Sequence, residues 1–344
     1  MRVARRRTFL PWALGALAAV SLLAAGARGN TVFDVTYDPD VPANVQTAFG
    51  QAAARWSALL RDNVTVKITV GWDATLGQGV LGAAGFYVAY GDFDEVRSLV
   101  INGAEAGDAR ETALLPYLPT AAEFNNVHLP SGFAFANTGY LTTANWKAVG
   151  GSYTGTDGTI RFSSDFSWDY DPSNGITAGT YDLVGVATHE IGHCLGFMSG
   201  IDPIDYYMKY GVPVYDAWAP TDVWVSVLDF FRFDTSDLGA EFNFTAAARD
   251  LTPDPTGSQS FYYGDGSVLM STGADNGDGY QGSHWKDLMS LGIMDPTAAA
   301  GEVLAIGQND LIALDLIGWD VVPEPATLAL VALGGLFILR RRPA

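Results

Sequence analysis

The sequence predicts an α+β fold, with a mixed sheet and helices in an N-terminal part and a more irregular C-terminal part. Between residues 41 and 61, apolar residues recur at spacings of three and four, the period of an amphipathic helix. Residues 64–70 follow with the β-branched, alternating pattern of a strand. Beyond Gly200 the chain is rich in Tyr, Trp, Phe, Asp and Gly and shows no clear period. The regular core of the protein is therefore expected before residue 200.

The other elements follow in chain order. The Gly-rich stretch 77–85 is expected to be a loop, and it is no phosphate cradle because no Lys-Ser/Thr follows it. Thr180 is suited to cap a helix that begins near Tyr181, and Gly318 to end the last helix. The remaining predicted elements are strands at 31–37, 98–101, 159–164, 260–263 and 267–270, helices at 112–118 and 309–319, and an irregular segment at 121–137. The strand at 159–164 precedes the helix expected near Tyr181 and is interpreted as an edge strand of the sheet.

The first 29 residues predict a signal peptide. Four arginines precede an apolar run over residues 10–25, and small residues at 25–29 offer a cleavage site. An uncleaved N-terminal anchor is the alternative interpretation. Either one predicts that the protein is exported.

The last residues, 322–344, predict a second targeting signal. Val322-Pro323-Glu324-Pro325 is followed by an apolar run and then by three arginines at 340–342, which fit a cytoplasmic stop. This tail resembles the PEP-CTERM sorting tails of Gram-negative bacteria. The resemblance implies transient anchoring in the inner membrane, recognition and removal of the tail by an exosortase-type enzyme, and release to the cell surface or extracellular matrix. A plain transmembrane anchor is the alternative.

Composition excludes several classes of partner. The formal net charge is −19, and eight of the nineteen basic residues lie in the two end segments. The body is therefore still more acidic, which disfavours nucleic acids and anionic membrane surfaces. Cys194 is the single cysteine, so no intramolecular disulfide can form.

The segment His189-Glu190-Ile191-Gly192-His193 matches the H-E-x-x-H pattern of a zinc site. On a helix, His189 and His193 lie on one face and can share one metal ion. Glu190 lies about 100° further round, where it can reach a zinc-bound water as general base without ligating the metal. Gly196 follows and allows the helix to end in a sharp turn. The pattern predicts a catalytic Zn²⁺ ion that activates a water molecule for the hydrolysis of peptide bonds.

A catalytic zinc site needs a third protein ligand. The chain has four histidines, at 128, 189, 193 and 284, and in the common metzincin pattern the third ligand would fall at Ser199, a poor zinc ligand. Downstream, Gly282-Ser283-His284 is followed by Met294-Asp295-Pro296. Together with the zinc motif and the terminal helix, this order resembles the leishmanolysin-like branch of the metzincins over about residues 159–319. The resemblance implies that His284 is the third ligand and that Met294 is the Met-turn methionine beneath the metal.

The chain departs from that branch in having no disulfide framework and no pro-domain. A carboxylate such as Glu241 as third ligand, in a different zinc class, is an alternative. His128 has no partner motif, and Cys194 is interpreted as a small buried residue rather than a redox or latency thiol. Asp275, Asn276 and Asp278 offer oxygen atoms for Ca²⁺, but their spacing is not that of an EF-hand loop, and a solvated turn is the simpler interpretation.

The sequence thus predicts a metzincin-like, exported zinc endopeptidase that acts on a protein or peptide substrate. The alternative is a surface or matrix binding protein on the same scaffold with little hydrolytic activity. The predicted parts are a signal peptide (1–29), an N-terminal catalytic subdomain with the zinc helix (30–200), a C-terminal subdomain with the third ligand and the Met-turn (201–321), and the sorting tail (322–344).

Overall fold

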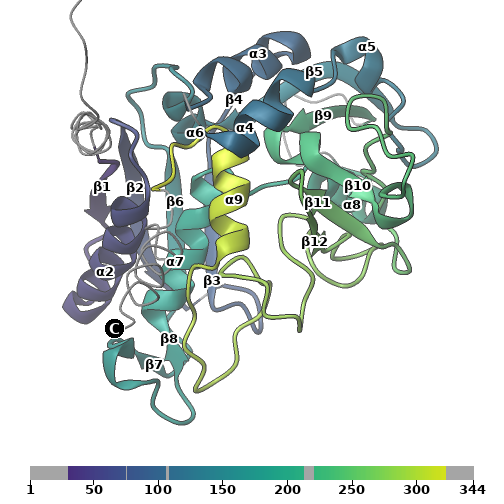
Figure 1. Cartoon of the computed structure of the whole chain (residues 1–344). Helices are drawn as coiled ribbons and strands as arrows, with labels where there is room; N and C mark the ends of the chain where they lie inside the picture. The colour runs from purple at the N-terminus through teal and green to yellow at the C-terminus, as the bar shows by residue number, and fades with distance from the viewer. Residues whose placement is uncertain (1–29, 75, 106–107, 213–220, 323–344) are drawn as a thin grey trace, which may run out of the picture.

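A computed structural model describes residues 30–74, 76–105, 108–212 and 221–322, and Figure 1 shows their arrangement. The first sheet has the strand order β1-β2-β6-β3, built from β1 (Val32–Tyr37), β2 (Thr65–Asp73), β6 (Gly158–Ser163) and β3 (Gly82–Phe86). The first three strands are parallel and β3 is antiparallel to β6. The predicted α+β fold with a mixed N-terminal sheet is confirmed.

Two helices pack together beside this sheet. Helix α2 (Ala43–Leu59) contacts α7 (Leu183–Cys194), and the Trp56 indole N–H donates to the carbonyl of Thr188 at 2.9 Å. The periodic apolar residues predicted to form this helix face are buried, among them Phe49 and Trp56. Because α7 carries the H-E-x-x-H motif, the packing of α2 on α7 helps to fix the position of this motif.

A second sheet has the order β4-β5-β9, from β4 (Val88–Asp92), β5 (Ala134–Thr142) and β9 (Asp222–Ser226). Helix α3 (Phe93–Gly103) packs against β5. The strand predicted at 98–101 is wrong, since these residues belong to α3. The Asp92 side chain caps the helix at the N–H of Asp94, and the buried Phe93, Val96 and Val100 recur at helical spacing.

The C-terminal part contains a third, antiparallel sheet of β10 (Arg232–Asp234), β11 (Gln259–Tyr262) and β12 (Ser267–Met270). This confirms the two strands predicted at 260–263 and 267–270. The remaining helices are α4 (Ala109–Leu114), α5 (Ala121–Phe124), α6 (Thr143–Ala148), α8 (Ile201–Tyr210) and α9 (Gln308–Leu316). Strands β7 (Trp168–Asp169) and β8 (Tyr181–Asp182) form a short parallel pair, and 3-10 turns lie at Leu115–Tyr117, Pro172–Asn174, Val227–Phe231 and Thr235–Asp237.

Two predictions about the first sheet are wrong. The stretch 77–85, expected to be a loop, contributes most of strand β3. The strand expected at the sheet edge, β6, lies inside the sheet between β2 and β3, and its Ile160 and Phe162 are fully buried. A Gly- and Ala-rich segment has low strand propensity by itself, but pairing with β6 and packing on α7 override that preference.

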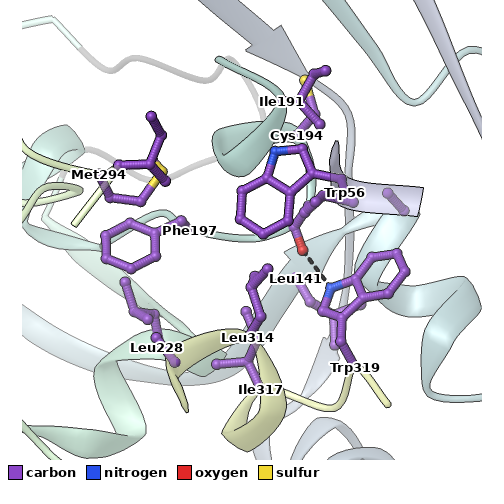
Figure 2. Close-up of a cluster of buried hydrophobic side chains, with 14 of the residues drawn as sticks. Trp56, Leu141, Ile191, Cys194, Phe197, Leu228, Met294, Leu314, Ile317 and Trp319 are labelled. Atoms are coloured by element: carbon purple, nitrogen blue, oxygen red, sulfur yellow. Dashed lines mark hydrogen bonds between the residues drawn. The ribbon is translucent and has the colours of Figure 1, made fainter. Parts of the chain in front are cut away.

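One hydrophobic core joins residues from both sides of Gly200. Figure 2 shows side chains from α2, α7 and α9 in this core, together with Met294. The Trp319 indole N–H, just after α9, donates to the carbonyl of Leu195 at 2.7 Å. The division of the body at residue 200 stays a prediction, because residues on both sides share this core.

The predicted signal peptide and nearly all of the predicted tail lie outside the described residues. Within the parts of the chain that the structure describes, no helix has the length and apolar character needed to cross a bilayer.

Candidate metal centre

Helix α7 presents His189 and His193 one turn apart. It begins at Leu183, where the Asp182 side chain accepts the N–H of Gly185 at 2.8 Å. The cap is therefore Asp182 and not the predicted Thr180, because Tyr181 and Asp182 are drawn into strand β8. At the other end Gly196 has φ +121°, and a Cβ there would lie 3.0 Å from Ile317 Cδ1. Both the backbone conformation and the space require glycine, as the motif predicted.

The structure brings the three predicted histidine ligands together. The Nε2 atom of His193 lies 3.1 Å from that of His189 and 3.2 Å from that of His284, and the last two lie 3.2 Å apart. Tetrahedral Zn²⁺ with bonds of about 2.0–2.1 Å separates its ligand atoms by about 3.3 Å. Among the described residues, these histidines are the one group of three or more His, Cys, Asp or Glu with ligand atoms within 4.8 Å of one another.

Each imidazole is held by its other nitrogen. Nδ1 of His189 lies 2.7 Å from the carbonyl of Ile293, that of His193 lies 2.7 Å from the carbonyl of Phe197, and that of His284 lies 3.2 Å from the carbonyl of Gln281. Since a carbonyl only accepts, each Nδ1–H donates and each Nε2 keeps its lone pair.

Burial keeps these rings neutral. Desolvation lowers the pKa of His189 to about 4 and that of His193 to about 3, and lowers the pKa of His284 well below its usual range. Three acceptor nitrogens, those of the buried His193 and His284 and the partly buried His189, then face one another with no proton to share between them. Such a donor set fits a cation such as Zn²⁺, which borderline-soft imidazole nitrogens bind well.

Glu190 lies beside this cluster and faces strand β3. A Cβ on Gly82 would lie 2.8 Å from Glu190 Oε1, so the carboxylate occupies space that only glycine leaves free. Burial raises the Glu190 pKa to about 8, and a hydrogen bond from the Ala84 backbone opposes that rise. Glu190, the three histidines and the β3 residues line one open cleft of about 1290 Å³.

Met294 packs against the helix that carries the histidines. A Cβ on Gly192 would lie 2.4 Å from its sulfur, and the Met294 side chain is buried. The backbone that leads into Met294 is fixed by Asp310 in α9. Its carboxylate accepts the N–H groups of Ile293 at 2.7 Å and Met294 at 3.2 Å and the Trp285 indole N–H at 2.7 Å. Sequence reasoning missed this role of Asp310, although its position in the first helical turn is a capping signal.

The other residues considered from the sequence do not join the histidine cluster. Ser199 is buried and its hydroxyl donates to Asp229 at 2.7 Å. His128 is exposed and pairs through its backbone with residues 249–251, and Glu241 is exposed as well. Cys194 is buried against Gly158, and burial raises the pKa of its thiol.

The proposed calcium ligands have protein partners. The N–H groups of Asp275 and Asn276 donate to the Asp205 carboxylate at 2.8 and 2.7 Å, and Asp278 pairs with Lys286 at 2.7 Å. Calcium binding at this turn stays a prediction.

Comparison with known families gives one result. The PEP-CTERM protein-sorting motif matches residues 321–342. This chain therefore carries the signal of exported proteins that an exosortase-type enzyme recognises and sorts at the membrane of Gram-negative bacteria. No curated protein matches the chain. The motif covers the tail and does not extend into the body.

Proposed function

We propose that the body of this protein is a zinc endopeptidase of the metzincin type, similar to the leishmanolysin-like branch, and that it is released at the cell surface or into the extracellular matrix. The observation that carries the proposal is the convergence of three neutral imidazole Nε2 atoms within 3.2 Å of one another, in the same cleft as the buried Glu190. Three nitrogen ligands with an open side are the arrangement of catalytic zinc, whereas structural sites use four protein ligands.

When bound, a zinc ion supplies Lewis acidity that polarises a carbonyl group and acidifies water. Glu190 supplies the proton transfer: its carboxylate accepts a proton from the attacking water and delivers it to the leaving amine. A positive charge at the imidazoles favours the ionised form of Glu190, which is the form that accepts a proton. The Ala84 backbone hydrogen bond also favours that form and orients the carboxylate.

Strand β3 supports a peptide as substrate. It lies at the edge of its sheet and lines the cleft. The carbonyl of Leu81 accepts the N–H of Ser163, and the N–H of Tyr87 donates to the carbonyl of Asp157. The odd-numbered residues of this segment therefore direct their peptide groups toward β6. In an antiparallel pair the alternate residues point outward, so the peptide groups of Gly82, Ala84 and Phe86 face away from β6. The N–H of Ala84 donates to the Glu190 carboxylate, so it is not one of the groups with which a substrate would pair. An extended peptide could pair with this edge and pass its scissile bond in front of the histidines.

The test is hydrolysis of casein or gelatin by the purified protein, with and without a chelator. Activity should vanish on chelation and return with Zn²⁺. Glu190→Gln should retain zinc while hydrolysis falls by at least about 100-fold, the usual contribution of a general base. A zinc-loaded protein without activity would favour the alternative of a binding protein, and near-normal activity in the variant would remove Glu190 from the mechanism.

A further inference from the structure

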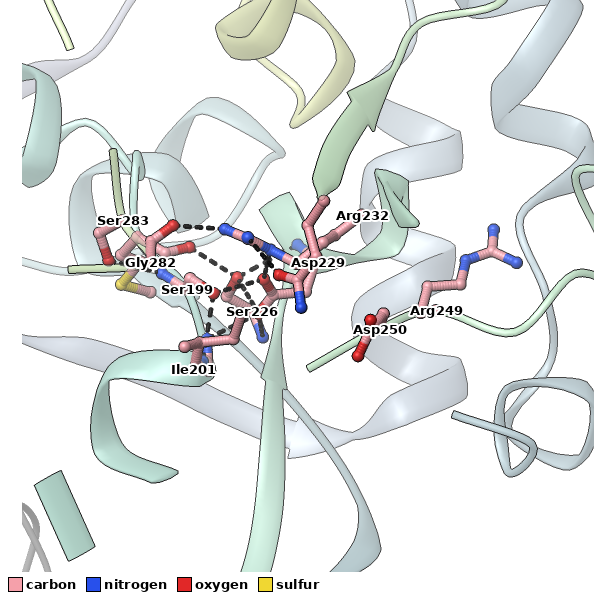
Figure 3. Close-up of polar contacts among 12 residues, drawn as sticks. Ser199, Ile201, Ser226, Asp229, Arg232, Arg249, Asp250, Gly282 and Ser283 are labelled. Atoms are coloured by element: carbon pink, nitrogen blue, oxygen red, sulfur yellow. Dashed lines mark hydrogen bonds and ion pairs between the residues drawn. The ribbon is translucent and has the colours of Figure 1, made fainter. Parts of the chain in front are cut away.

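A buried polar network contacts the segment that carries His284, and Figure 3 shows much of this network. It joins the residues just after the zinc helix, the turn before β10 and the pair Gly282–Ser283. We propose that Asp202 and Arg232 are positioning residues that hold Gly282 and Ser283 and thereby fix the third imidazole. This inference rests on the proposed function, because it assigns how that metal site is kept in shape.

His284 needs such support more than the other two histidines do. His189 and His193 project from one helix, whereas His284 follows a turn outside any helix or strand. Its Nδ1 contact of 3.2 Å is also longer than the 2.7 Å contacts of the other rings. The placement of this ring therefore depends on what fixes the preceding backbone.

Asp202 holds that backbone from the side of helix α8. Its Oδ1 accepts the N–H of Gly282 at 2.6 Å, and its Oδ2 accepts the hydroxyl of Ser283. The same Ser283 hydroxyl accepts the N–H of Ser199 at 2.8 Å. The residue next to His284 is thus tied to the chain that leaves the zinc helix.

Arg232 holds the same turn through a second set of hydrogen bonds. Its fully buried guanidinium donates from Nη2 to the carbonyl of Gly282 and from Nη1 to the carbonyl of Ser271 at 3.1 Å. Ser271 in turn donates its N–H to the carbonyl of His284 at 3.0 Å. The Arg232 guanidinium therefore holds the carbonyl of Gly282 directly and the carbonyl of His284 through Ser271.

Asp229 completes the arrangement and explains the residue found at position 199. Its carboxylate accepts Arg232 Nε at 3.2 Å, the Ser199 hydroxyl at 2.7 Å and the Gly200 N–H at 2.7 Å. Gly282 is also closely packed, since a Cβ there would lie 2.8 Å from Ile201 Cβ. Ser199 thus connects the zinc helix to the network that holds the third ligand.

Stability alone does not account for this network. A buried Arg–Asp pair bears a desolvation cost that an apolar core of equal volume avoids. What the charges add here is direction, since their hydrogen bonds fix the peptide groups that flank one ligand. Contacts that orient metal ligands typically change metal affinity by about 10- to 100-fold.

The test compares Asp202→Asn and Ser283→Ala with the wild-type chain, with Asp254→Asn as matched control. Asp254 is also half-buried and accepts an N–H and a hydroxyl, those of Thr256, both at 2.8 Å. Zinc affinity is measured by competition with a chromophoric chelator, ligand geometry by the absorption spectrum of the Co²⁺-loaded protein, and folding by thermal unfolding of the metal-free protein.

The two variants should bind zinc about 10- to 100-fold more weakly and change the Co²⁺ spectrum, while the metal-free melting temperature stays close to that of wild type. Asp254→Asn should leave affinity and spectrum unchanged. Variants that bind zinc within about threefold of wild type with an unchanged spectrum would overturn the positioning role alone. A wild-type chain that binds no zinc would overturn the proposed function and this inference together. Arg232→Met is a further variant, and its failure to fold would leave the test with the two milder changes.

Discussion

At the scale of single residues, Gly82 shows how a missing side chain shapes the cleft. The Glu190 carboxylate and the Val186 side chain fill the space where a Cβ would stand, at 2.8 and 3.0 Å. Any larger residue at this position must displace one of them. Because proton transfer depends on heavy-atom distances of about 2.6–3.2 Å, a small displacement of Glu190 weakens it.

Gly82→Ala should therefore lower the rate of peptide hydrolysis by about 10- to 100-fold while zinc affinity stays at the wild-type level. Gly85→Ala is the matched control on the same strand, because the nearest atom to its Cβ, the Thr159 carbonyl oxygen, lies 3.9 Å away. Steady-state kinetics and zinc titration of both variants check this. Equal losses in the two variants would mean that the strand as a whole, and not the Glu190 contact, was disturbed.

Glu111, which is remote from the zinc motif in sequence, makes the stability of the fold depend on pH. Its side chain is 1% exposed, and burial followed by repulsion from Asp315 raises its pKa from 4.5 to about 8. Between these two pKa values the unfolded chain loses this proton and the folded protein keeps it. This group therefore stabilises the fold fully below pH 4.5, and its contribution is lost as the pH rises to about 8.

Glu111→Gln replaces the protonated acid with a neutral amide that can still accept the Glu105 N–H. The variant should melt at the wild-type temperature near pH 4.5 and at a higher temperature at pH 8.5, by roughly 2 °C for each kcal/mol gained. Thermal unfolding at both pH values measures the difference, with the exposed Glu241→Gln as control. A shift of equal size at both pH values would contradict the role given to ionisation.

At the scale of elements, strongly periodic segments were predictable and context-dependent ones were not. Helix α2 was predicted because its apolar spacing matches the face that packs on α7. The run Leu99-Val100-Ile101 looks like a strand because its residues are apolar and mostly β-branched, yet Asp92 caps a helix that includes it. Strand β3 could not be predicted, since its glycines and alanines acquire strand character only through pairing with β6.

The candidate site shows the same limit. The i, i+4 spacing predicted that His189 and His193 share a face, because that geometry is local. The place of His284 beside them was predicted only by resemblance to a family, since 91 residues separate it from His193. The roles of Asp202 and Arg232 follow from tertiary contacts between distant segments, for which the sequence carries no local signal, and for Asp310 the sequence offers only the capping signal of its place in α9. Whether the site binds zinc stays a prediction.

At the scale of the whole molecule, the end of the body returns to its beginning. Val322 N–H donates to the Leu59 carbonyl at 2.7 Å, and Arg61 N–H donates to the Asp320 carbonyl at 2.8 Å. The sorting motif starts at residue 321, and the described part of the body ends at residue 322. Val321, the first residue of the motif, still pairs with the body through an isolated antiparallel β-bridge to Leu60.

A chain that ends at Val322 should therefore fold cooperatively, stay in solution and keep its zinc affinity. A chain that ends at Ile317 loses the buried Trp319 and its bond to Leu195, which should cost about 3–5 kcal/mol, as for other buried tryptophans. Thermal unfolding and metal content of both truncations measure this. An insoluble, metal-free chain ending at Val322 would show that the motif is part of the fold.

The metal site also joins the two ends of a long excursion. The chain leaves the zinc helix after Cys194 and returns to it at His284, so an ion held by all three rings would close this loop in addition to the shared core. Binding that occurs only in the folded state stabilises it, by about 2.7 kcal/mol when free zinc is at 100 times its Kd. Removing zinc should thus lower the melting temperature by roughly 5 °C.

His284→Ala should abolish most of that zinc-dependent gain, because two imidazoles on one helix neither complete the site nor reach the returning segment. His128→Ala is the control, since this histidine is exposed and its backbone bond to Arg249 does not involve its ring. Zinc stoichiometry and melting temperature, each with and without chelator, decide between the two histidines. Loss of zinc in the His128 variant with retention in the His284 variant would overturn the assignment, whereas the opposite pattern would tie the two parts of the body through the third ligand.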